Sequence, residues 1–254
     1  MNEPITVNDR ADVIVTVSAY ALGKQLGVEE AMRELERQIQ KPDRASLPAA
    51  RCIARLRELA SLAVRTDTGG TVLGKVRSRH AHDAWEVGAQ IGAKVWFSID
   101  DDVEATTATL RDMLEAVSEP RPRIVVAPCL IRSVSNGAVV ANVDLPRILS
   151  RPRYLSSGAV LRPIAERRAG FALVAMNRDA LAAVRNVSGH LAYVDQDGVE
   201  RLGLFHDEIV DKRWLSEDLS FFARVPSWVE VEALLTGHTS HAGQPLNLGD
   251  VGGI

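Results

Sequence analysis

Short apolar runs alternate with longer segments of helical periodicity through the first half of the chain. The clearest run is Val13-Ile14-Val15-Thr16-Val17, which indicates a strand buried on both faces of a parallel sheet. Longer segments with apolar residues three or four apart predict amphipathic helices. We therefore expect strands at residues 13–17, 71–76, 95–99 and 124–127, and helices at 28–40, 48–64, 80–92 and 104–117.

Turn signals lie closer together in the second half. Ser135-Asn136-Gly137 predicts a hairpin over residues 131–143, and Asp197-Gly198 predicts another over 193–204. The remaining pattern predicts a strand at 170–176, helices at 178–187 and 217–224, and a strand at 229–235. Alternating strands and helices favour an α/β fold with a parallel sheet. We expect a single domain whose approximate halves, residues 1–128 and 129–254, share one cleft.

Composition narrows the class of protein. With 254 residues and 46% apolar content, the chain can bury a full core, and its net charge of −3 gives no overall positive field for nucleic acid. Cys52 and Cys129 lie in apolar contexts, which is typical of buried free thiols in a reducing compartment. No apolar run approaches transmembrane length, so we expect a cytoplasmic protein without a membrane span.

Positive charge is concentrated in one region. From Arg132 to Arg168 the chain holds seven arginines against only Asp144 and Glu166. A solvated loop region is the common explanation for such an excess. The same arginines would also suit contacts with phosphate groups, so DNA is one candidate partner for this region.

Three adjacent carboxylates, Asp100-Asp101-Asp102, follow the predicted strand at 95–99. Carboxylates in this position repel one another unless a cation or a group of hydrogen-bond donors compensates them. Oxygen ligands at the carboxyl end of a strand suit Mg²⁺ or Mn²⁺, ions that often bridge a protein to phosphates. The alternative is a helix cap, in which an aspartate accepts hydrogen bonds from free backbone N–H groups.

Three features of the second half carry further candidate chemistry. Gly170 opens a predicted strand and allows close backbone approach to a ligand. Ser216-Glu217-Asp218 places two acids in the first turn of a helix, and His238 and His241 follow the last predicted strand. Each feature alone has an ordinary explanation as a helix cap or a loop.

Taken in order, these parts resemble the GT-A glycosyltransferases. The resemblance covers residues 12–243 and consists of strand-Asp-x-Asp, a strand and helix led by glycine, Ser-Glu-Asp, and His-x-Gly. It implies a GT-A-like, Rossmann-type mixed sheet flanked by helices, with the nucleotide-sugar on the N-terminal half and the acceptor on the C-terminal half. It also implies a divalent cation, Mn²⁺ or Mg²⁺, that bridges the donor diphosphate.

The resemblance implies roles for individual residues. Asp100, Asp102 and His241 match the metal ligands, with His238 as the rival to His241. Asp218 matches the general base, with Glu217 next in line. The residues implied to contact the donor are Ser18, Ala19 and Tyr20 at the exit of the first strand, together with Arg79, Asp100, Asp101 and Gly170.

Several questions stay open on the sequence. The donor is a UDP- or GDP-sugar, and the acceptor is a glycan, a small metabolite, a protein, a lipid-linked sugar or a hydroxylated DNA base. An aspartate in the Glu-Asp position favours inversion over retention at the anomeric carbon. A metal-dependent nucleotidyltransferase and a non-catalytic module that binds nucleotide-sugars or nucleic acid are the alternative functions, although no Gly-rich phosphate loop of the Gly-x-x-x-x-Gly-Lys type is present.

Overall fold

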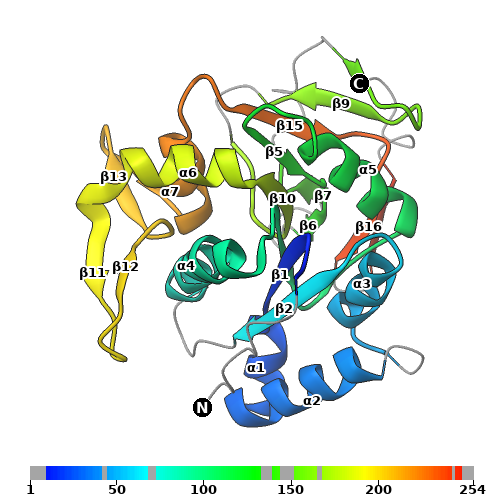
Figure 1. Cartoon of the computed structure of the whole chain (residues 1–254), viewed down its shortest axis with the longest axis horizontal. Coiled ribbons are helices and arrows are strands. Elements are labelled where there is room, and N and C mark those ends of the chain that lie inside the picture. The colour runs from blue at the N-terminus through cyan, green and yellow to red at the C-terminus, as the bar shows by residue number, and fades with distance from the viewer. Residues whose placement is uncertain are drawn as a thin grey trace.

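A mixed sheet of eight strands forms the centre of the computed structural model (Figure 1). The structure describes residues 10–41, 45–67, 73–132, 139–143, 152–164, 168–241 and 244–247. The strand order is β2-β1-β3-β10-β5-β15-β9-β8. The bounds are β1 (Val13–Ser18), β2 (Leu62–Asp67), β3 (Val95–Asp100), β5 (Arg123–Val126), β8 (Arg153–Tyr154), β9 (Val160–Pro163), β10 (Leu173–Asn177) and β15 (Glu230–Leu234).

Strand direction divides this sheet into parallel and antiparallel parts. Strands β2, β1 and β3 run parallel to one another, and so do β5 and β15. Strand β10 comes from the second half of the chain but lies antiparallel between β3 and β5. Strands β9 and β8 extend the far edge with antiparallel pairs. The two halves of the chain are therefore joined within one sheet.

Helices cover both faces of the sheet (Figure 1). Val15 and Phe97 point into one core with α2, α3 and α5, whereas Ile14 and Trp96 point into a second core with α4, α6 and α7. This alternation follows from the two-residue period of a strand. The predicted fold class, a mixed α/β sheet flanked by helices, is confirmed. The helices are α1 (Tyr20–Leu26), α2 (Val28–Gln40), α3 (Pro48–Arg57), α4 (Leu73–Ile91), α5 (Thr107–Val117), α6 (Arg178–Val187) and α7 (Glu217–Arg224).

Smaller sheets surround the central one. Strand β4 (Val103–Ala105) pairs with β16 (His238–His241), which pairs with β17 (Gln244–Asn247). The hairpins are β6 (Leu130–Arg132) with β7 (Val139–Ala141), β11 (Ala192–Val194) with β12 (Glu200–Leu202), and β13 (Glu208–Val210) with β14 (Arg213–Leu215). Both predicted hairpins are confirmed as strand pairs. The turn expected at residues 135–137 lies outside the described residues.

Three predicted boundaries are wrong. The helix expected over 48–64 ends at Arg57, and residues 62–67 form β2, because they pair in register with β1 at the sheet edge. Helix α4 begins at Leu73 instead of residue 80, so residues 73–76 are helical where the sequence indicated a strand. Helix α5 begins at Thr107 because residues 103–105 pair with β16. For β2 and β4 a pairing partner distant in sequence overrides the local pattern.

No described helix is both long enough and apolar enough to cross a lipid bilayer.

The first turn of α1 is capped by a residue far away in sequence. Its own N-cap residue, Ala19, has no side chain that can accept a hydrogen bond, and the Asp101 carboxylate accepts from the backbone N–H groups of Ala21 (3.2 Å) and Leu22 (2.5 Å). Asp101 is buried, and this burial raises the pKa of its carboxyl to about 6. Both carboxylate oxygens of Asp101 thus serve the helix terminus, and its expected contact with the donor stays a prediction.

This remote cap gives a stability prediction. We expect Asp101→Ala to lower the free energy of unfolding by about 1–2 kcal/mol, because two backbone donors of α1 lose their acceptor. Asp101→Asn keeps one acceptor oxygen and should lose less. Urea unfolding of the three proteins measures the difference. An unchanged midpoint in Asp101→Ala would show that the cap does not stabilise the fold.

Candidate functional site

The carboxyl ends of β2, β1 and β3 meet at one edge of the sheet. The strand register places Ser18 between Asp67 on β2 and Asp100 on β3. Ser18 and Ala19 are buried, and the Ser18 hydroxyl lies 3.4 Å from Nδ1 of His80. Tyr20 begins α1, two residues after the end of β1. The residues expected to face a nucleotide thus lie at a polar sheet edge, which is where α/β sheets bind ligands.

Arg77 of α4 joins three acidic residues at this edge. Its side chain is 3% exposed and forms ion pairs with Asp100 (2.9 Å), Glu217 (3.2 Å) and Asp218. Asp100 ends β3, and the other two acids begin α7. Arg77 therefore connects a helix, a strand end and a helix start that are far apart in sequence. We call Arg77, Asp100, Glu217 and Asp218 the carboxylate cluster.

Burial makes the charges of this cluster interdependent. Burial opposes the charge on Arg77, but Asp100, Asp218 and Glu217 together raise its pKa. Burial also raises the pKa of Asp100, with Arg77 acting in the opposite direction and Asp218 adding to the rise. For Glu217, burial and the neighbouring Asp218 charge raise the pKa of the carboxyl, and Arg77 offsets part of that rise. One cation thus balances three carboxylates incompletely.

The two acids of α7 are held differently. One oxygen of Asp218 accepts a hydrogen bond from Arg77, and the other accepts from the backbone N–H of Phe171 at 3.0 Å. The neighbouring Gly170 packs closely against Asn142. Its N–H donates to the Asn142 carbonyl at 2.6 Å, and a Cβ at Gly170 would lie 3.1 Å from the Asn142 Cβ. Both oxygens of Asp218 are thus engaged, and the expected contact of Gly170 with the donor stays a prediction.

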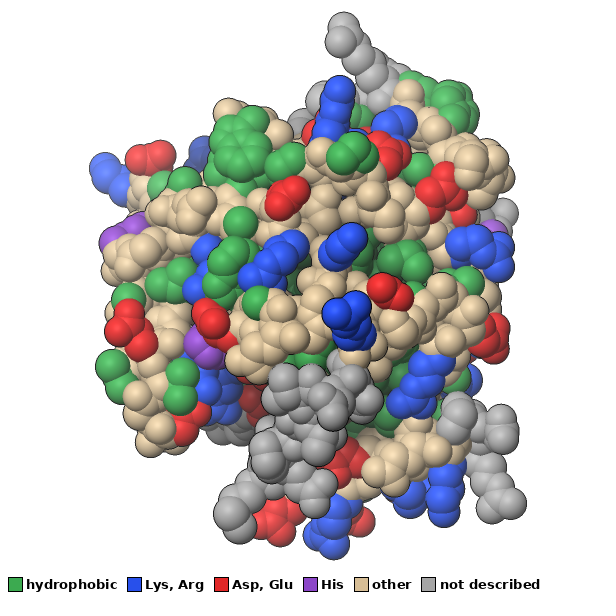
Figure 2. Space-filling model, in the orientation of Figure 1, with side chains coloured by type: hydrophobic (Ala, Val, Ile, Leu, Met, Phe, Trp, Pro, Cys, Tyr) green, Lys and Arg blue, Asp and Glu red, His purple; other side chains and the backbone are tan. Residues whose placement is uncertain are grey.

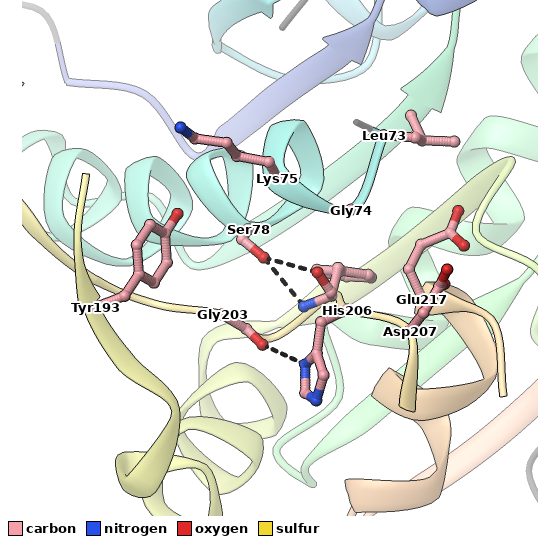
Figure 3. A pocket seen from close by; sticks show the side chains of 10 residues that line it. Leu73, Gly74, Lys75, Ser78, Tyr193, Gly203, His206, Asp207 and Glu217 are labelled. Atoms are coloured by element: carbon pink, nitrogen blue, oxygen red, sulfur yellow. Dashed lines mark hydrogen bonds between the residues drawn. The ribbon is translucent and has the colours of Figure 1, made fainter. Parts of the chain in front are cut away.

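A cavity of about 670 Å³ opens beside Glu217 (Figure 3). The first turns of α4 form one wall, and the segment from Gly203 to Asp207 forms the other. The Ser78 hydroxyl accepts from the Phe205 N–H at 3.0 Å and fastens this segment to the helix. The lining residues are Leu73, Gly74, Lys75, Ser78, Tyr193, Gly203, Phe205, His206, Asp207 and Glu217. Glu217 is the member of the carboxylate cluster that lines this cavity.

Asp102 and His241 form a second polar pair. Asp102 Oδ2 lies 3.3 Å from His241 Nε2, and the two side chains are 29% and 28% exposed. The antiparallel register of β4 and β16 explains this approach, because His241 lies opposite Val103. His238 lies at the other end of β16, where its carbonyl accepts from the Thr106 N–H. Of the two candidate histidines, His241 is therefore the one beside Asp102.

The three ligands expected for a metal do not come together as one group. No group of three or more His, Cys, Asp or Glu residues with metal-binding geometry occurs in the described ranges. Asp100 is paired with Arg77 instead, and Asp101 caps α1. Of the acidic triplet, Asp102 contacts His241. Asp100, Asp102 and His241 stay the predicted ligands, and of these the structure brings Asp102 and His241 into direct contact.

Arg79 does not join the carboxylate cluster. Its guanidinium pairs with Asp67 (3.2 Å) and with Asp195 (2.8 Å). Residues 77 and 79 are two positions apart on α4 and therefore face different sides of the helix. Sequence reasoning missed Arg77 because it began this helix at residue 80. A helix begun at residue 73 would have placed the two arginines on different faces and made Arg77 a candidate.

The region between Arg132 and Arg168 gives no support for a DNA contact within its described part. Arg153 pairs with Glu119 and, at 2.8 Å, with Glu232, so acidic residues already balance its charge. The face in Figure 2 shows basic and acidic side chains interspersed, without one gathered basic patch. Several arginines of this region, including Arg147 and Arg151, lie outside the described residues.

Comparisons with known proteins give a weak structural likeness only. No family model matches the chain, and no curated protein matches its sequence. The crystal structure of A197 from STIV superposes with a TM-score of 0.44 and 9% identity, covering 90% of this chain and 84% of that one. GalNAc-T7 with UDP, GalNAc and Mn²⁺ superposes with a TM-score of 0.48 and 10% identity, covering 91% of this chain and 43% of that one. At this level of similarity neither superposition indicates a function.

The carboxylate cluster gives a second stability prediction. We expect Arg77→Ala to lower the free energy of unfolding at neutral pH by about 3–5 kcal/mol, because three carboxylates lose their cation at a largely buried site. Arg121→Ala is the matched control: Arg121 pairs with Glu230 at 3.4 Å but is 74% exposed, so its loss should stay below about 1 kcal/mol. Urea unfolding of both variants compares the two losses. Equal losses would contradict a central role for Arg77.

Proposed function

We propose that the protein is a divalent-metal-dependent glycosyltransferase, which moves a sugar from a nucleotide-sugar to an acceptor hydroxyl. The supporting observation is the convergence at one sheet edge. The buried Arg77 pairs with Asp100 at the end of β3 and with Asp218 at the start of α7. Asp102 lies two residues beyond the end of β3 and contacts His241 of β16. Such an edge offers ligands for a metal, a polar strand end for a nucleotide and a carboxylate for proton transfer.

Asp102 and His241 fit a divalent cation bound together with a substrate. A carboxylate oxygen and an imidazole nitrogen suit Mn²⁺, and Mg²⁺ commonly takes one or two protein carboxylates and completes its shell with phosphate and water. Both side chains are partly exposed and their ligating atoms lie 3.3 Å apart. When bound, the metal would act as a Lewis acid that neutralises charge on the leaving nucleoside diphosphate.

The donor nucleotide is assigned to the strand ends beside this pair. Ser18, Ala19 and Tyr20 lie where β1 passes into α1, next to the end of β3. We assign the nucleobase to this exit, with the diphosphate directed toward Asp102 and His241. UDP- and GDP-sugars remain equal candidates for the donor.

Glu217 is the better general base of the two acids in α7. It lines the cavity, and its raised pKa makes it a stronger base than an ordinary glutamate. Asp218 ranks first in the family resemblance, but both its oxygens already accept hydrogen bonds. In the proposed step the acceptor hydroxyl gives its proton to the Glu217 carboxylate while its oxygen bonds to the anomeric carbon. The bond from that carbon to the diphosphate breaks, and the configuration inverts.

Metal-dependent donor binding tests the proposed site without an acceptor. We expect a UDP- or GDP-sugar at saturating concentration to raise the melting temperature by about 5 °C or more with Mn²⁺ and by far less with EDTA. Asp102→Asn and His241→Ala should remove the metal-dependent part of the shift. His238→Ala lies on the same strand away from Asp102 and should keep it. A full shift in Asp102→Asn would contradict the ligand assignment.

Turnover distinguishes the two carboxylates of α7. We expect Glu217→Gln to lower kcat by about 10²–10⁴-fold while the thermal shift with donor is retained. Asp218→Asn should chiefly lower stability, because it weakens the contacts with Arg77 and Phe171. If Asp218→Asn loses the larger share of kcat and Glu217→Gln stays within tenfold of the wild type, the base is Asp218.

The pH profile provides the control for this assignment. Since the base acts in its ionised form, the rate should fall as the pH drops through the Glu217 pKa. Burial raises that pKa above the ordinary 4.5, so the acidic limb of kcat/KM should bend above this value. The limb should disappear in Glu217→Gln, and a limb that persists there unchanged would assign it to another group.

A further inference from the structure

We infer that the acceptor is a neutral, polyhydroxylated ring compound, a free sugar or the terminal sugar of an uncharged glycoside, which binds in the cavity beside Glu217. This inference rests on the proposed function and names its acceptor class. The cavity's volume of about 670 Å³ lies within the range of small-molecule sites and holds one or two sugar-sized rings.

The position of Glu217 assigns the cavity to the acceptor instead of the donor. A general base must lie within hydrogen-bond reach of the hydroxyl that it deprotonates. Glu217 lines the cavity and also contacts Arg77 at 3.2 Å, so the cavity meets the carboxylate cluster at this one residue. The residues assigned to metal and nucleobase, including Asp102 and Ser18, are not among its described lining residues.

The charge of the lining disfavours a phosphorylated acceptor. Lys75 contributes the ammonium group of the described lining, and its Nζ lies 2.6 Å from Asp195 Oδ1. Asp207 and Glu217 contribute two carboxylates, of which Asp207 is exposed. Glu217 is paired with Arg77 and Lys75 with Asp195, so an anionic ligand would meet the exposed Asp207 carboxylate without a free cation from Lys75. A neutral ligand avoids this repulsion, which argues against DNA as the acceptor.

The hydrogen-bonding groups of the cavity match a polyol. Asp207 and Glu217 contribute carboxylates that accept hydrogen bonds, and the two charges are close enough for Asp207 to add to the rise that burial causes in the pKa of Glu217. In Figure 3 both side chains lie at the same end of the cavity. A ring with several hydroxyls can donate to both carboxylates. Leu73 supplies apolar surface for the C–H groups of such a ring.

The segment from Gly203 to Asp207 is held close to the first turns of α4, and these two elements form the walls of the cavity. A Cβ at Gly74 would lie 2.7 Å from the Phe205 carbonyl oxygen, so only glycine permits the present contact. The Ser78 hydroxyl and the Phe205 backbone add two hydrogen bonds across the same contact, at 3.0 and 3.3 Å. The cavity is therefore a built feature of the fold, and its walls do not depend on a ligand.

An acceptor panel tests this inference. The probes are glucose, galactose, their 4-nitrophenyl glycosides, the matching 6-phosphates and a DNA duplex with hydroxymethylated bases, each with the donor identified by its thermal shift. Release of nucleoside diphosphate and the mass of the product are measured. We expect a neutral sugar to be the best acceptor, with a kcat/KM at least tenfold above that of its 6-phosphate. A phosphorylated sugar or DNA as the best acceptor would overturn the inference.

Two variants link the preference to the cavity. Asp207→Ala should raise the acceptor KM about 5–10-fold, with the donor thermal shift unchanged, because one hydrogen-bond acceptor is lost. Asp207→Lys should narrow the preference for neutral over phosphorylated acceptors about tenfold. Asp179→Lys is the matched control, since Asp179 is exposed on α6 and outside the cavity lining. An unchanged acceptor KM in Asp207→Ala would overturn the placement.

The donor measurement separates failure of this inference from failure of the proposed function. If the Mn²⁺-dependent shift with a nucleotide-sugar is present but no neutral sugar is glycosylated, the acceptor assignment alone is wrong. If no nucleotide-sugar produces the shift, the proposed function itself fails.

Discussion

The ion pairs of Arg77 are the interaction on which the rest of the site depends. A buried guanidinium with three acidic partners fixes the end of β3, the start of α7 and the first turns of α4 relative to one another. Those three segments come from both halves of the chain. Since charges in a buried site must be paired, the position of Arg77 also sets the positions of the acids around it. The cavity wall and the proposed base are placed by the same contact.

The acidic triplet shows how three adjacent carboxylates are tolerated at one strand end. Asp100 pairs with a buried arginine, Asp101 accepts two backbone N–H groups of α1, and Asp102 faces an imidazole. Asp100 and Asp101 thus have their own hydrogen-bond donors, and beyond the effect of burial the Asp102 charge still adds to the raised pKa of both. Only Asp102 is left in a position that suits a metal. The adjacent acids Glu217 and Asp218 also differ. Both oxygens of Asp218 accept hydrogen bonds, whereas Glu217 lines the cavity.

Local sequence pattern was sufficient for much of the fold. The bounds of α2, α6 and α7 agree with expectation, because each has a clear apolar face and a recognisable start. The approach of His241 to Asp102 was implied by the family resemblance and not by the local pattern. Strand β2 was missed because an edge strand is stabilised by pairing with β1, which no local pattern encodes. The role of Arg77 was missed because the predicted helix began at residue 80, and because its partners Glu217 and Asp218 lie 140 and 141 residues away.

The proposed metal position between Asp102 and His241 is the feature of the site that can be tested most directly. Anomalous scattering from a crystal grown with Mn²⁺ and a nucleoside diphosphate measures that place without any assumption about catalysis. We expect one strong peak about 2 Å from both Asp102 Oδ2 and His241 Nε2, with the diphosphate completing its ligands and Arg77 still paired with the carboxylate cluster. An anomalous peak at another position would contradict the proposed metal site. So would a nucleotide-bound structure in which Asp102 and His241 still contact each other and no peak lies beside them.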